Sequence, residues 1–107
     1  MYRDINREVN YNQAQELLSM TNGILLDVRS YQEYSEEHLP NAINIDLYNL
    51  NRDIQNVIPN RQTIIVTYCS CGIRSKQAQQ ILTQLGYTNV YNLKDGIYCR
   101  CRYFNNK

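Results

Sequence analysis

Apolar runs recur along the chain, and each has the length of a buried strand. Within a run the residues do not alternate between apolar and polar, which is typical of strands covered on both faces of a parallel sheet. The run at 62–68 is the richest in β-branched residues and is predicted to be the central strand. Strands are predicted over residues 23–28 (GILLDV), 39–45 (LPNAINI, after a turn at Pro40), 62–68 (QTIIVTY) and 88–93 (TNVYNL), with a brief strand around Ile5.

The segments between these runs are predicted to be helices. In two of them apolar residues recur at spacings of three and four, as on a helix buried on one face. Ser30 and Glu33 have the S-x-x-E spacing of a capping box, and Gly86 ends the last helix. Helices are therefore predicted over residues 13–20, 30–37, 47–58 and 75–86. Strands and helices that alternate with short connections pair in parallel through right-handed crossovers. The sequence predicts an α/β fold in a single domain, residues 1–107.

The charge balance argues against nucleic-acid or membrane-surface partners. The chain has 11 basic and 10 acidic residues, a net charge of +1, whereas such partners require a concentrated basic face. The first residues are polar and lack the apolar core of a secretory signal, and no apolar run approaches the ~18 residues that suggest a membrane span. We therefore expect a cytoplasmic protein, in which thiols are kept reduced.

The four cysteines stand in two C-x-C pairs, Cys69 with Cys71 and Cys99 with Cys101. In a reducing compartment, reactive, metal-binding or incidental cysteines are favoured over a disulfide framework. The C-x-C spacing counts against structural zinc, which usually uses C-x₂₋₄-C. For Cys99 and Cys101 we favour surface thiols in the C-terminal segment; sulfur relay, metal capture and intermolecular disulfides stay open.

The stretch YCSCGIRSK, residues 68–76, lies where the predicted central strand is followed by a helix. Ligands of open α/β sheets bind at this end of the strands, and a helix N-terminus favours an anion because its N–H groups are unpaired. A cysteine there, Cys69, loses its proton more easily. Gly72 allows a positive φ, so that N–H groups can converge on one point, and Arg74 adds a planar fork of donors. The loop predicts a thiolate beside a site for an anionic group such as sulfonate or phosphate.

Two separated motifs resemble those of the rhodanese family of single-domain sulfurtransferases. YCSCGIRSKQAQQILTQLGYTNVYNLKDGI resembles the active-site half of that domain, and LLDVRSYQEYSEEHLPNAINI resembles its other signature, so the likeness covers residues 24–97. It implies a five-stranded, mainly parallel sheet with helices on both faces. By the same resemblance Cys69 takes up sulfane sulfur as a persulfide, Asp27 and Arg29 brace the strand ends, and no metal or organic cofactor is required.

The spacing from Cys69 to Arg74 is C-x₄-R, which resembles the six-residue loop of the sulfurtransferases. Phosphatases that share the fold of this family carry a loop one residue longer, and Ser75 stands where their arginine would be. We therefore predict a sulfurtransferase that moves sulfane sulfur from thiosulfate or another persulfide donor to a thiol or protein acceptor. The alternatives are a persulfide carrier or thiol redox module that uses Cys69 and Cys71 and, less favoured, a phosphatase or arsenate reductase.

Each loop residue has a predicted role. The substrate-binding residues are predicted to be Arg74, through its side chain, and, chiefly through backbone N–H groups, Ser70, Cys71, Gly72, Ile73 and Ser75. The Ser75 side chain is equally a candidate helix cap. For Cys71 a tolerated small side chain is favoured, and a resolving thiol that attacks the Cys69 persulfide is the alternative. His38 is expected to be structural, and Glu37 stands where the family often has glycine.

Overall fold

A computed structural model describes residues 7–98 of the chain. Its centre is a five-stranded sheet in the order β1-β5-β4-β2-β3, in which every neighbouring pair is parallel. The predicted α/β fold and five-stranded sheet are confirmed. The strands are β1 (Glu8–Val9), β2 (Ile24–Asp27), β3 (Ile43–Asn44), β4 (Ile65–Tyr68) and β5 (Val90–Leu93).

All four predicted helical segments are helical, although the ends of each differ by one to three residues from the prediction. The helices are α1 (Tyr11–Ser19), α2 (Tyr31–Glu36), α3 (Leu50–Val57) and α4 (Ile73–Gln84), and a 3₁₀ turn, η1 (Leu47–Asn49), precedes α3. The single helix predicted over 47–58 is therefore divided into η1 and α3. The predicted capping box of α2 is present, because the Ser30 hydroxyl accepts from the Glu33 N–H and the Glu33 carboxylate accepts from the Ser30 N–H.

Helices cover both faces of the sheet, so the core has two halves. Successive strand residues point to opposite faces: Leu26 and Ile65 pack with residues of α3 and α4, whereas Leu25 and Val66 pack with Ala14 of α1. Burial of both faces explains why the strand sequences do not alternate. Within residues 7–98, no helix combines the length and the apolar character needed to cross a membrane.

The edges of the sheet were the hardest part to predict. The N-terminal strand lies at Glu8–Val9, where it pairs with β5, whereas Ile5, around which it was predicted, lies outside the described residues. Cys99 and Cys101 also lie outside them.

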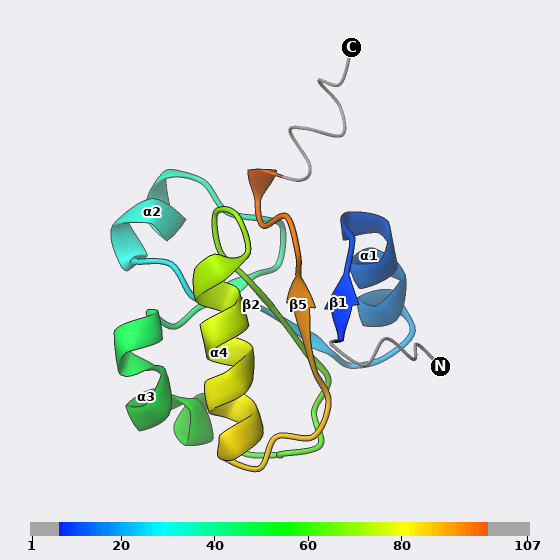
Figure 1. The fold of residues 1–107 in the computed structure, drawn as a ribbon, viewed down its shortest axis with the longest axis vertical. Coiled ribbons are helices and arrows are strands. Elements are labelled where there is room, and N and C mark those ends of the chain that lie inside the picture. The colour runs from blue at the N-terminus through cyan, green and yellow to red at the C-terminus, as the bar shows by residue number, and fades with distance from the viewer. Residues whose placement is uncertain (1–6, 99–107) are drawn as a thin grey trace.

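Because the strands are parallel, their carboxyl ends lie at one edge of the sheet, and Figure 1 shows the loop before α4, helix α2 and the end of β5 gathered there.

Candidate functional site

Cys69 directly follows β4 and lies beneath a tight loop that leads into α4. Its side chain is buried, at 1% exposure. The sulfur accepts hydrogen bonds from the N–H groups of Gly72, at 3.2 Å, and Ser75, at 3.3 Å, and the Ser75 hydroxyl oxygen lies 3.5 Å from it. Two N–H donors and the Ser75 hydroxyl, from the loop and the first turn of α4, thus converge on one sulfur atom.

Two glycines permit this tight loop. Gly72 has φ +96°, and a Cβ there would overlap the carbonyl oxygen of Lys94. Gly96 has φ +68°, and a Cβ there would overlap the carbonyl oxygens of both Cys69 and Ser70. The backbones of the two segments therefore pack directly on one another, and the Ile97 N–H donates to the Cys69 carbonyl at 2.8 Å.

The surroundings of Cys69 favour its ionised form. Burial raises the pKa of the Cys69 thiol, but hydrogen bonds from the Ser75 hydroxyl and from the N–H groups of Ser75, Cys71 and Gly72 lower it more, so the pKa lies below that of an ordinary cysteine. A thiolate is the nucleophilic form of cysteine. The site can therefore hold a sulfur nucleophile without a neighbouring general base.

Ser75 does not have one of its two predicted roles, that of a helix cap. Helix α4 begins at Ile73, so Ser75 lies inside its first turn, and the capping position is occupied by Gly72 without a side-chain cap. The prediction of Ser75 as a helix cap is therefore wrong, because the positive φ of Gly72 starts the helix earlier than the sequence suggested. Ser75 is buried with its hydroxyl toward Cys69.

Arg74 is engaged by a residue 41 positions away. Its two terminal nitrogens donate to the two carboxylate oxygens of Glu33, at 2.9 and 3.1 Å, and Nη2 also donates to the Ser70 hydroxyl at 3.2 Å. The Arg74 guanidinium is the main reason that the pKa of Glu33 falls to about 2. The sequence indicated Glu33 as a capping residue only, and this second contact was missed. Substrate binding by Arg74 stays a prediction.

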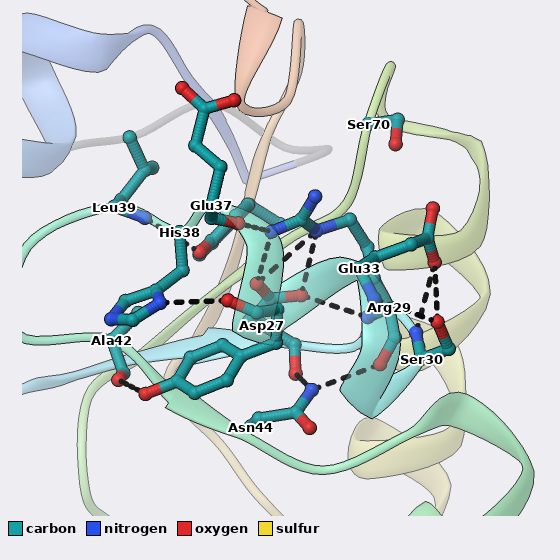
Figure 2. Close-up of polar contacts among 12 residues, drawn as sticks. Asp27, Arg29, Ser30, Glu33, Glu37, His38, Leu39, Ala42, Asn44 and Ser70 are labelled. Carbon is teal, nitrogen blue, oxygen red and sulfur yellow. Dashed lines mark hydrogen bonds and ion pairs between the residues drawn. The ribbon is translucent and has the colours of Figure 1, made fainter.

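Asp27 and Arg29 form a buried ion pair at the end of β2 (Figure 2). Arg29 Nη2 donates to Asp27 Oδ2 at 2.8 Å and to the Glu37 carbonyl, and the amide of Asn44 donates to the carbonyls of Asp27 and Arg29 at 3.0 and 2.9 Å. The side chains are 0% and 5% exposed. This arrangement is suited to the predicted bracing role, which stays a prediction.

His38 and Glu37 lie on the segment after α2. His38 Nδ1 lies 2.9 Å from the Tyr34 carbonyl, and its ring stacks on the Tyr34 ring at a centroid distance of 3.9 Å. These contacts agree with a structural histidine. Glu37 has φ −166°, which is extended backbone, so a residue other than glycine fits the turn without strain.

Other loop residues lie in different settings. Cys71 is an exposed free thiol, and Ile73 is exposed at the start of α4. Asn92 of β5, which the sequence did not indicate, is buried and donates to the Glu8 carboxylate at 3.2 Å, with the Gly72 carbonyl 3.5 Å away. Among residues 7–98, no group of three histidines, cysteines or carboxylates is arranged to hold a metal ion.

Comparison with known families and sequences gives consistent matches. The rhodanese-like domain profile matches residues 10–98. Thiosulfate sulfurtransferase PspE of Escherichia coli is 40% identical over 73 residues, 65% of this chain and 70% of that protein. Thiosulfate sulfurtransferase GlpE of Coxiella burnetii is 28% identical over 90 residues, 84% and 82% of the two chains. A tRNA uridine(34) hydroxylase of Buchnera aphidicola is 32% identical over 100 residues, but this chain spans only 32% of its length.

Solved structures give the same result. The human single-domain sulfurtransferase TSTD1 superposes with a TM-score of 0.79 at 26% identity, over 90% of this chain and 96% of that one. An E. coli rhodanese with bound anions has a TM-score of 0.64 at 36% identity, over 67% and 85% of the two chains.

Proposed function

Because the chain belongs to the family of rhodanese-like domains, we propose that it moves sulfane sulfur from thiosulfate, or another persulfide donor, to a thiophilic acceptor through a persulfide on Cys69. Membership in the family confirms the prediction of a rhodanese-type sulfurtransferase. Beyond the family, we propose the sulfur donor, the sulfur acceptor and the persulfide intermediate on Cys69.

The observation that carries the proposal is the convergence of the Gly72 N–H, the Ser75 N–H and the Ser75 hydroxyl on Cys69 Sγ. In the first half-reaction the Cys69 thiolate attacks the outer sulfur of thiosulfate. A bond forms between Cys69 Sγ and that sulfur, the S–S bond of thiosulfate breaks, and sulfite leaves with the electron pair. The product is a Cys69 persulfide whose terminal sulfur is anionic, and N–H groups at a helix start stabilise such a charge.

The second half-reaction restores the enzyme. A thiolate of a small molecule or protein, or cyanide in the test tube, attacks the terminal sulfur of the persulfide. The bond from Cys69 Sγ to that sulfur breaks, and Cys69 leaves as the thiolate with which the cycle began. This is covalent catalysis of the ping-pong type. Under this proposal Arg74 and the loop N–H groups bind the anionic part of the donor.

The test is turnover with thiosulfate and cyanide, measured as the rate at which thiocyanate forms. We expect turnover by the wild type, none by Cys69→Ser, since serine cannot carry a persulfide, and activity in Cys71→Ser, the matched substitution two residues away. An active Cys69→Ser variant would overturn the proposal. Wild-type protein that accepts sulfur once without turnover would favour the carrier alternative, and hydrolysis of an aryl phosphate would favour a phosphatase.

A sulfur acceptor, either a thiol or a protein, follows from the proposed chemistry, because the reaction needs a thiophile. A cytoplasmic location and the absence of a nucleic-acid partner stay predictions from the sequence.

A further inference from the structure

Three cations near the Cys69 loop are each paired with a carboxylate. Arg29 pairs with Asp27 at 2.8 Å, Lys76 with Glu8 at 2.8 Å, and Arg74 with Glu33 at 2.9 Å. The last pair also contacts the loop before α4, because Arg74 Nη2 donates to the Ser70 hydroxyl.

The carboxylate of Glu33 occupies the part of Arg74 that an oxyanion would use. A guanidinium binds a planar or tetrahedral oxyanion best through two parallel N–H donors, and Glu33 accepts from both terminal nitrogens of Arg74. Glu33 Oε1 is also held by the Ser30 N–H at 3.0 Å, as the capping box of α2 requires. Helix α2 thus holds a negative charge against Arg74 in the first turn of α4.

We propose that Glu33 sets the charge selectivity of the Cys69 loop: its carboxylate competes with anionic donors for Arg74 and selects against doubly charged donors relative to singly charged or neutral ones. This inference rests on the proposed function, in which Cys69 attacks the donor. Glu33 does not touch the sulfur, and it acts through Arg74.

The exposure of the pair sets the size of the effect. The side chains of Arg74 and Glu33 are 39% and 35% exposed, so water screens the pair and an incoming anion can displace the carboxylate. Removing the charge of Glu33 should therefore change the preference for anions by about 2- to 5-fold. A buried pair would give a larger effect together with a loss of stability.

The test measures charge preference at Cys69 without requiring sulfur transfer. In a Cys71→Ser background, the rates at which iodoacetate, an anion, and iodoacetamide, a neutral analogue, alkylate Cys69 are compared by mass spectrometry of the Cys69 peptide. Glu33→Gln retains the shape of the cap and removes the charge. Glu36→Gln removes the same charge from an exposed residue of the same helix and is the matched control.

We expect Glu33→Gln to raise the iodoacetate-to-iodoacetamide ratio by about 2- to 5-fold, with a clearly smaller change in Glu36→Gln. In turnover, the KM of Glu33→Gln should fall more for thiosulfate, with two charges, than for methanethiosulfonate, with one, while kcat changes little. A merely structural role of Glu33 would alter both donors equally.

A ratio that stays constant or falls in Glu33→Gln, or a rise of the same size in Glu36→Gln, would overturn the inference. If neither reagent reaches the buried Cys69, the comparison of the two KM values decides. A changed ratio in a protein that transfers no sulfur would overturn the proposed function and leave the charge selectivity in place. A Cys69 that reacts with neither reagents nor donors would overturn both.

Discussion

Replacing Ser75 with alanine isolates the contribution of one hydroxyl to the reactivity of Cys69. The hydroxyl oxygen lies 3.5 Å from Cys69 Sγ, and the substitution retains the Ser75 N–H that donates to the same sulfur at 3.3 Å. Hydrogen bonds to charged groups contribute about 1.5–3 kcal/mol, and a contact of this length falls at the low end. Since about 1.4 kcal/mol corresponds to a factor of ten, we expect the loss of the hydroxyl to raise the pKa of Cys69 and to slow its alkylation at low pH by about tenfold.

The sign follows from which form the hydroxyl stabilises. It donates to the thiolate, and its hydrogen bond lowers the pKa of Cys69, so its loss favours the thiol. The pH at which Cys69 becomes half-reactive should therefore move upward, while the limiting rate at high pH stays nearly unchanged because the thiolate itself is still formed.

The assay is the rate of alkylation of Cys69 by iodoacetamide against pH, in a Cys71→Ser background. Thr83→Ala is the control, because it removes a hydroxyl from the same helix whose bond is to the Gln79 carbonyl, at 2.8 Å. An unmoved midpoint in Ser75→Ala, or an equal shift in Thr83→Ala, would refute the assignment of Ser75 as a donor to the sulfur.

Three further substitutions test the surroundings of the loop. Gly96→Ala should lower the free energy of unfolding, measured by urea denaturation, by about 1–3 kcal/mol and impair sulfur transfer, because its Cβ would overlap backbone oxygens. Gly86→Ala is the control: it is also at positive φ, but its Cβ would lie 3.0 Å from Cδ of the flexible Arg61 side chain, so it introduces the backbone strain without a clash against backbone. Asp27→Asn should lower the free energy of unfolding by about 3–5 kcal/mol in the same measurement, since it leaves the buried guanidinium of Arg29 without its anion. A loss below about 1 kcal/mol, as for a surface pair, would contradict the buried pairing of Asp27 with Arg29. The pKa of Glu33 is lowered from 4.5 to about 2, so its contribution to stability is fully present above pH 4.5 and is lost as the pH falls through about 2. In acid denaturation, the free energies of unfolding of the wild type and Glu33→Gln should converge there. A difference that persists unchanged below pH 2 would contradict the lowered pKa.

The backbone geometry around Cys69 could be predicted because it is local. A strand followed by a glycine-containing turn and a helix is enough to place Cys69 among backbone N–H groups. The apolar runs likewise predicted the α/β fold, since a strand buried on both faces has a recognisable composition.

Contacts between distant segments could not be predicted in this way. Glu33 already satisfied a local rule as a capping residue, so nothing in the sequence indicated its contact with Arg74, 41 positions away. The close approach of Gly96 to Cys69 was not predicted, because it depends on how β5 and β4 lie in the sheet. The start of α4 was placed late because Gly72 occupies the capping position without a side-chain cap, whereas the sequence offered Ser75 as a conventional capping residue.

The most direct test of a persulfide on Cys69 is the mass of the protein when it is first reduced and then incubated briefly with thiosulfate. Peptide mapping then locates the modified residue. We predict a gain of about 32 Da, one sulfur atom, on the Cys69 peptide of the wild type and of Cys71→Ser, and no gain in Cys69→Ser. A gain that persists in Cys69→Ser, or a loss of two hydrogens that depends on Cys71 in place of the added sulfur, would contradict a persulfide on Cys69.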